Sequence, residues 1–215
     1  MKFIVSIFAS LVMALAMMSP ASGTPATAAY NEVVNSQGCQ PNAQYSGQDT
    51  YIIGDSITYR GSNPHLKDIR PNWCYDAIGG SPVNSLPSRV QEMATTVGYS
   101  RNIILAMGTN PSDNWNKQNY INVVDSIPTT SNVILVTCYR GYKAGGERWG
   151  GAEQVDQYSE WMNEIASTRP NVTVLKWKWH VLRGAVVLSD GIHARPDDGE
   201  IFWANMINDG VKSLQ

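Results

Sequence analysis

Five apolar runs along the chain have the length and composition of buried β-strands. Segments compatible with α-helices lie between most of them, so strand and helix alternate. This alternation predicts a parallel sheet covered by helices on both faces. The predicted strands are Thr50–Ile53, Trp73–Ile78, Asn102–Met107, Asn132–Cys138 and Asn171–Trp177.

Four segments carry helix signals. Pro87–Val97 begins with a proline suited to a first helical turn, and Gly98 follows it. Trp115–Ile127 ends before Pro128, and Pro196–Val211 is the expected last helix. Right-handed crossovers between these elements give a single doubly wound α/β domain. The expected inward-facing residues are Val155, Tyr158, Ser159, Met162 and Ile165 in Ala152–Thr168, and Ile201, Phe202, Met206 and Val211 in the last helix.

The N-terminus has the pattern of a secretory signal peptide. Lys2 is followed by an almost unbroken apolar run to Met18, and then by small residues. We therefore expect a signal peptide over residues 1–28, an irregular lead-in over 29–48 and one domain over 49–215, in a secreted or extracytoplasmic protein. A retained N-terminal anchor is the alternative, although the run is slightly short for a membrane span.

Composition excludes several classes of partner. The net charge is −2, and the Lys and Arg residues are scattered along the chain. This pattern gives no footprint for nucleic acid and no polybasic membrane patch. No second apolar stretch of spanning length follows the first, so we expect no stable membrane insertion after signal cleavage.

Three cysteines remain after export: Cys39, Cys74 and Cys138. An oxidising compartment favours one disulfide with one thiol left over. Pairing of Cys39 with Cys74 would join the lead-in to the second strand. Cys138 as a nucleophile is the competing idea, but no histidine is near it in sequence and it ends an apolar run, which favours a buried thiol.

Chemistry-bearing residues follow the predicted strands. Ser56 stands in Gly-Asp-Ser-Ile-Thr after the first strand, and Asp190 and His193 are three residues apart after the apolar run 185–188. A serine hydroxyl becomes a useful nucleophile only with a base within hydrogen-bond reach and a third group that orients the base. Gly80 and Asn110 each follow another strand, and all these loops are expected at one edge of the sheet. Taken singly, Ser56 could be a helix cap, and Gly80 and Asn110 could be turn residues.

Four short motifs, at Ser56, Gly80, Asn110 and Asp190–His193, occur in this order along the chain. Together they resemble the SGNH (GDSL-type) hydrolase superfamily, and the resemblance spans roughly residues 49–211. It implies a flavodoxin-like three-layer α/β/α domain with about five parallel strands. It also implies Ser56 as nucleophile, His193 as base and Asp190 as the group that orients the base. The implied oxyanion hole consists of the N–H groups of Ser56 and Gly80 and the amide of Asn110. Asp55 is expected to fix the loop around Ser56.

Two details depart from the family pattern. Ser-Ile-Thr replaces the commoner Ser-Leu-Ser, and Pro111 stands where the family often has Asp. Within the superfamily, the Asp-Ala-x-x-Gly segment ending at Gly80 resembles SGNH domains linked to cell-surface O-acyl transfer more than it resembles long-chain lipases.

The long loop over residues 139–151 is the expected substrate wall. Its aromatic and basic side chains suit sugar rings and anionic glycans, and deletion of residues 143–150 is expected to raise KM for a glycan ester but to spare a small aryl acetate. The alternative is plain packing beneath a flexible loop. The expected substrate contacts are Trp115, Tyr139, Arg140 and Trp149.

The loops carry few Leu, Ile or Phe residues, which favours a short acyl group, above all acetyl, on a carbohydrate or another polar alcohol. Three functions fit: a serine ester hydrolase, an O-acyltransferase that receives its acyl group from a separate membrane partner, and a non-catalytic glycan-binding module. Retention of Ser56, Asp190 and His193 argues against the last. No metal or organic cofactor is predicted, because no His/Cys cluster has ligand spacing and no dinucleotide or phosphate-loop motif occurs.

Overall fold

A six-stranded sheet forms the centre of the described part of the chain, residues 33–34 and 49–215 of the computed structural model. Its order is β1-β3-β2-β4-β5-β6, and all neighbours are parallel except β1, which runs antiparallel to β3. The five parallel strands therefore have the flavodoxin-like order expected from the family resemblance. The strands are β1 (Val33–Val34), β2 (Thr50–Gly54), β3 (Cys74–Ile78), β4 (Asn102–Ala106), β5 (Asn132–Val136) and β6 (Val172–Leu175).

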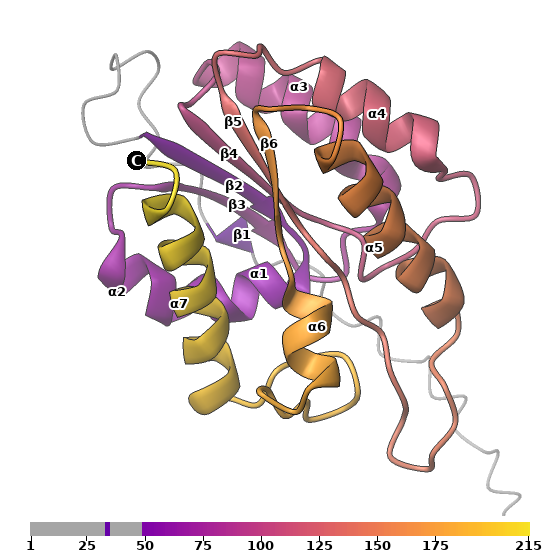
Figure 1. Cartoon of the computed structure of the whole chain (residues 1–215). Helices are drawn as coiled ribbons and strands as arrows, with labels where there is room; N and C mark the ends of the chain where they lie inside the picture. Colours follow the sequence, from indigo (N-terminus) through magenta and orange to yellow (C-terminus); the bar gives the residue numbers. More distant parts are fainter. Residues whose placement is uncertain (1–32, 35–48) are drawn as a thin grey trace, which may run out of the picture.

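Helices cover both faces of this sheet (Figure 1). One face carries α3 (Leu86–Thr96), α4 (Lys117–Asp125) and α5 (Ala152–Ala166), and Ile53 and Leu105 point into the core beneath them. Ile52 and Ile104 belong to the core of the other face. Successive strand residues thus feed opposite cores, as the two-residue period of a strand requires. The elements of that second face are α1 (Ser56–Gly61), the π-helical turn η1 (Ser62–Leu66), α2 (Lys67–Ile69), α6 (Trp177–Leu182) and α7 (Asp198–Lys212).

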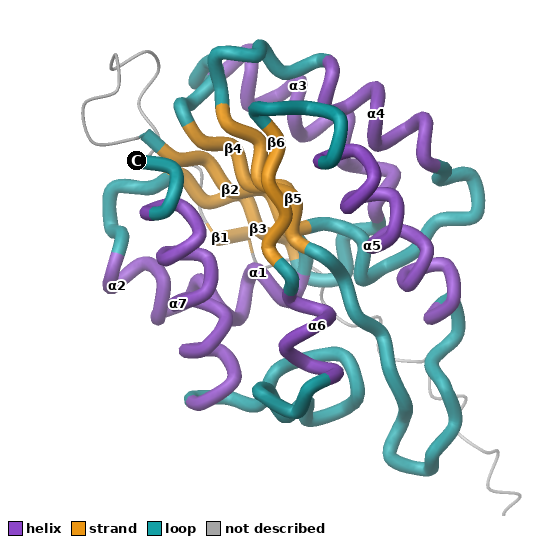
Figure 2. The backbone as a smooth tube through the Cα atoms, viewed as in Figure 1, coloured by secondary structure: helices purple, strands orange, loops and turns teal. Residues whose placement is uncertain are grey.

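The register aligns the carboxyl ends of the central strands. Gly54 at the end of β2 pairs with Ala106 of β4 on one side and with Ala77 of β3 on the other. The segments that follow these three strands therefore start side by side at one edge of the sheet, where α1 follows β2 and loops follow β3 and β4 (Figure 2).

The short α-helices α1, α2 and α6 were not predicted, because six residues or fewer cannot display a helical period. Residues 185–188 were interpreted as an apolar run before Asp190, but they lie in the connection between α6 and α7 and pair only through one isolated bridge, Leu188 with Ala194. The prediction of the inward-facing residues of α7 was also partly wrong. Ile201 is 42% exposed, whereas Trp203, Ala204, Ile207 and Val211 are buried at i, i+1, i+4 and i+8. All five residues predicted for the inner face of α5 are buried.

The cysteines divide as expected. Cys74 is disulfide-bonded, and Cys138 is a buried free thiol whose pKa is raised by desolvation. A thiol in this state is a poor nucleophile. Cys39, the predicted partner of Cys74, lies outside the described residues.

The predicted signal peptide also lies outside the described residues. Within the lead-in, Val33 and Val34 form the edge strand β1 instead of irregular chain. None of the helices in the described ranges is long and apolar enough to cross a membrane.

Candidate active site

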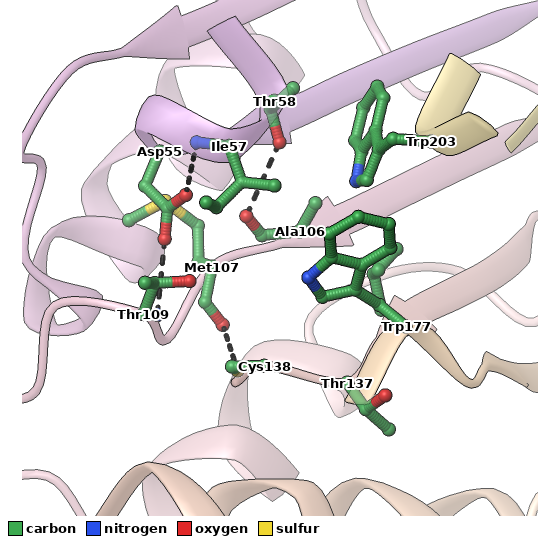
Figure 3. Close-up of a pocket in the computed structure, with 11 residues that line it drawn as sticks. Asp55, Ile57, Thr58, Ala106, Met107, Thr109, Thr137, Cys138, Trp177 and Trp203 are labelled. Atoms are coloured by element: carbon green, nitrogen blue, oxygen red, sulfur yellow. Dashed lines mark hydrogen bonds between the residues drawn. The ribbon is translucent and has the colours of Figure 1, made fainter. Parts of the chain in front are cut away.

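The turn after β2 presents Ser56 as the first residue of α1. Asp55, not Ser56, is the helix cap: its Oδ1 accepts a hydrogen bond from the N–H of Ile57 at 3.1 Å. Its Oδ2 accepts one from the N–H of Thr109 at 3.1 Å (Figure 3). Asp55 therefore fixes the turn around Ser56, as predicted, and also joins it to the loop that follows β4. Burial, which outweighs these two bonds, raises the pKa of the Asp55 carboxyl above its ordinary value.

Ser56, His193 and Asp190 form one continuous hydrogen-bonded chain. The Oγ of Ser56 lies 2.9 Å from Nε2 of His193, and Nδ1 of His193 lies 2.7 Å from Oδ2 of Asp190. An ionised carboxylate can only accept, so Nδ1 carries the ring proton in the neutral imidazole. Nε2 is then left as the acceptor for the Ser56 hydroxyl. This is the arrangement that a serine nucleophile and its base require.

Asp190 is held by the loop that it shares with His193, and we call residues 189–194 the acid–base loop. Oδ1 of Asp190 accepts hydrogen bonds from the N–H of Ile192 at 2.9 Å and of His193 at 2.7 Å. Burial is the largest single influence and raises the pKa of Asp190, but these bonds and the His193 side chain together outweigh it and lower the pKa below its ordinary value. Asp190 is thus kept ionised.

The loops that carry the predicted oxyanion donors Gly80 and Asn110 are bonded to each other. Gly80 has a φ of +71°, a conformation that favours glycine. The side-chain amide of Asn110 donates to the carbonyl of Ser81 at 3.3 Å, and the Asn110 carbonyl accepts from the N–H of Val83 at 3.0 Å. These two bonds tie the Asn110 loop to the Gly80 loop. Ser56, at the start of α1, has an N–H group without a partner inside the helix.

Arg89 is a buried residue that supports the site and that our sequence reasoning missed. Only 5% of it is exposed, and it makes a bidentate ion pair with Asp76, with Nη2–Oδ1 at 2.6 Å and Nε–Oδ2 at 2.9 Å. Its Nη1 donates to the carbonyl of Gly54 at 2.9 Å and to Oγ of Ser81 at 3.3 Å. Arg89 thus connects the β2 and β3 turns. The signal was its position on the apolar face of a predicted helix, next to Val90.

The expected substrate contacts divide. The prediction that Trp115 contacts substrate is wrong, because Trp115 is 5% exposed and packs edge-on against Tyr120 in the core, with ring centroids 5.1 Å apart. Arg140 is near the site, because its Nη1 donates to the carbonyl of Thr109 at 3.0 Å. Tyr139 and Trp149 are half-buried on the same loop.

Tyr142 is an exposed aromatic residue of this loop that was not among the predicted substrate contacts. It is 58% exposed, and its backbone carbonyl contacts Gly191 in the acid–base loop.

A cavity of about 10 Å³ lies behind the Ser56 turn, between α1, α6 and α7 (Figure 3). Its walls include Asp55, Thr58, Trp177 and Trp203. Such a volume holds roughly one water molecule and no acyl chain. Among residues 49–215, no group of three or more His, Cys, Asp or Glu side chains is arranged to hold a metal ion.

Comparison with solved structures identifies the fold. No family model and no curated protein sequence matches the chain. The C-terminal catalytic domain of Streptococcus pneumoniae peptidoglycan O-acetyltransferase A, solved with a methylsulfonyl adduct, superposes with a TM-score of 0.63 at 22% identity, over 77% of this chain and 93% of that one. The chain has the fold of the SGNH (GDSL-type) hydrolases.

Two further SGNH-type structures support this assignment. A GDSL-like lipase from Bacteroides thetaiotaomicron has a TM-score of 0.62 at 14% identity and covers 82% of this chain and 93% of its own. The acetyl xylan esterase AlAXEase has a TM-score of 0.59 at 17% identity, with coverage of 75% and 98%. At these identities the likeness concerns the fold.

Proposed function

We propose that this protein is a secreted serine esterase that removes short acyl groups, above all acetyl, from carbohydrates or other polar alcohols. The observation that carries the proposal is the hydrogen-bonded chain from Ser56 through His193 to Asp190. The SGNH fold supports it, because Ser56 follows β2 and Asn110 follows β4, at the edge where these parallel strands end.

The proposed reaction proceeds through an acyl-serine. Oγ of Ser56 attacks the ester carbonyl while Nε2 of His193 takes the hydroxyl proton, and the same proton then goes to the leaving alcohol. The tetrahedral oxyanion is stabilised by the N–H groups of Ser56 and Gly80 and by the Asn110 amide. Water, deprotonated by His193, attacks the acyl-serine, releases the carboxylic acid and restores the Ser56 hydroxyl. Asp190 stabilises the imidazolium in both halves.

The structural neighbours include both kinds of enzyme, a peptidoglycan O-acetyltransferase domain and an acetyl xylan esterase. O-acyl transfer is therefore the second candidate. The two reactions share Ser56, His193 and Asp190 and differ in whether water or a sugar hydroxyl accepts the acyl group. For a transferase, we propose a separate membrane partner as the acyl source.

Product analysis by mass spectrometry separates the candidates. The protein is given 4-nitrophenyl acetate with and without cell-wall oligosaccharides, beside a Ser56→Ala control. Free acetate alone, lost in the control, is expected, whereas acetylated oligosaccharide would establish the transferase. Equal product from both proteins would refute the serine mechanism. A series from acetate to octanoate esters tests the acyl preference, and faster turnover of octanoate would contradict it.

A further inference from the structure

The loop over residues 139–151 is a β-hairpin, and we call it the 139–151 hairpin. It leaves the sheet after β5 and returns to α5, projecting beyond the edge that carries the site (Figure 2). Tyr142 and Arg148 form an antiparallel bridge, and the N–H of Trp149 donates to the carbonyl of Gly141 at 2.9 Å. The segment therefore has internal structure of its own.

This hairpin binds the backbone of the acid–base loop. Nε1 of Trp149 donates to the carbonyl of Asp190 at 2.8 Å, and the N–H of Gly141 donates to the carbonyl of Gly191 at 2.8 Å. Two consecutive carbonyls of the acid–base loop are thus fixed from one side, while the side chain of Asp190 holds His193 from the other.

The hairpin is anchored to the body of the domain at its base. Arg148 pairs with Asp156 of α5, and Asp156 in turn pairs with Lys178 of α6 at 3.0 Å. Near the other strand of the hairpin, Arg140 donates to the carbonyl of Thr109, next to Asn110. The hairpin therefore connects the oxyanion side of the site with the acid–base side.

The side chain of Trp149 makes several contacts within the protein. Besides its bond to Asp190, its ring lies 5.3 Å from the Arg140 guanidinium and 5.2 Å from the Lys143 ammonium, within cation–π range. These contacts fix the plane of the indole and so the direction of its N–H group. A role in stacking on a sugar would compete with them.

We propose that the 139–151 hairpin positions the acid–base loop, and that Trp149 is the positioning residue through which it acts. The inference rests on the proposed serine mechanism. It changes the expectation for the hairpin as a substrate wall: removal of residues 143–150 takes away Trp149, so turnover of a small aryl acetate should fall together with that of a glycan ester.

The decisive variant is Trp149→Phe, which keeps a ring and removes the N–H donor. A misplacement of about 1 Å at a reacting group can cost about 10²-fold in rate. We expect a roughly 10- to 100-fold lower kcat on both 4-nitrophenyl acetate and an acetylated oligosaccharide, with KM for the aryl ester changed less than about threefold. Trp179→Phe, at an exposed position of α6, is the matched control and should retain wild-type kinetics. A kcat for Trp149→Phe within twofold of the control on either ester would overturn the proposal.

A second measurement does not depend on turnover. The chain has three histidines, so ring N–H signals from ¹⁵N-histidine-labelled protein can be assigned with a His193→Gln variant. In Trp149→Phe, the Nδ1–H signal of His193 should broaden through faster exchange with solvent, while those of His65 and His180 stay unchanged. An unaltered His193 signal would refute the positioning role. If wild-type protein hydrolyses no ester but this signal responds, the proposed function fails and the positioning role stands.

Discussion

Gly191 is the position where one added methyl group should damage the site most specifically. It lies between Asp190 and His193 with a φ of +83°, and a Cβ built on it would lie 2.0 Å from the carbonyl oxygen of Tyr142. Gly184 has a similar φ of +72°, but a Cβ there meets no atom within 4 Å. Alanine is strained at both positions by about 1–2 kcal/mol, and only at Gly191 does it also collide with backbone.

The size of the collision sets the expected effect on the rate. A contact of 2.0 Å must open to at least 3.0 Å, so the acid–base loop or the 139–151 hairpin has to shift by about 1 Å. A shift of that size at His193 corresponds to about 10²-fold in kcat, or about 2.7 kcal/mol in the activation free energy.

The assay compares kcat for 4-nitrophenyl acetate and the thermal midpoint of Gly191→Ala and Gly184→Ala. Both variants should remain folded. The shared backbone strain lowers both midpoints by a few degrees, and the collision lowers that of Gly191→Ala further. Only Gly191→Ala should lose activity. A kcat for Gly191→Ala within threefold of that for Gly184→Ala would show that the tight packing of the two loops does not set the position of His193.

Three other predictions concern the supports of the site. Asn110→Ala should lower kcat by about 10²–10³-fold with the fold intact, as measured by steady-state kinetics and circular dichroism; a loss below threefold would remove Asn110 from the oxyanion hole. Arg89→Ala leaves the half-buried Asp76 without its partner and should reduce the free energy of unfolding in urea by about 3 kcal/mol, more than the double variant that also carries Asp76→Ala; equal losses would contradict this. The folded-state pKa of Asp190 lies below the ordinary 3.8, so its ionised form stabilises the fold above about pH 4, and this contribution is lost as the pH falls through the folded value. Asp190→Asn should therefore show a weaker loss of urea stability between about pH 4 and pH 2 than wild type, and parallel curves would contradict the shift.

The predicted elements succeeded where the pattern was long enough to repeat. β2 and β4 are buried on both faces, and their apolar runs mark them within one residue of their observed ends. Helix α5 has fifteen residues, so its buried face repeats several times. Helix α6 has six residues, and its Trp-Lys-Trp-His sequence shows no period, so it could not be separated from the strand before it.

The hydrogen-bonded chain of Ser56, His193 and Asp190 could be predicted because each residue type has few alternatives in that chemical pattern. Contacts that depend on packing could not be predicted in this way. Trp115 follows a strand, as a substrate-binding residue would, but the adjacent Asn116 caps α4 with its side chain and Trp115 packs inward on Tyr120. Trp149 binds Asp190 across 41 residues, and Gly141 binds Gly191 from still farther along the chain. At such separations no local pattern indicates contact.

The order of the chain has a consequence for when activity can arise. Ser56 precedes His193 by 137 residues, and the acid–base loop directly precedes α7, the last helix. A chain that is still emerging from a ribosome can pair β2 with β3 and β4 before His193, the base for its serine, has been made. The proposed ester hydrolysis would begin only once the acid–base loop has docked, so turnover would report that His193 has reached Ser56.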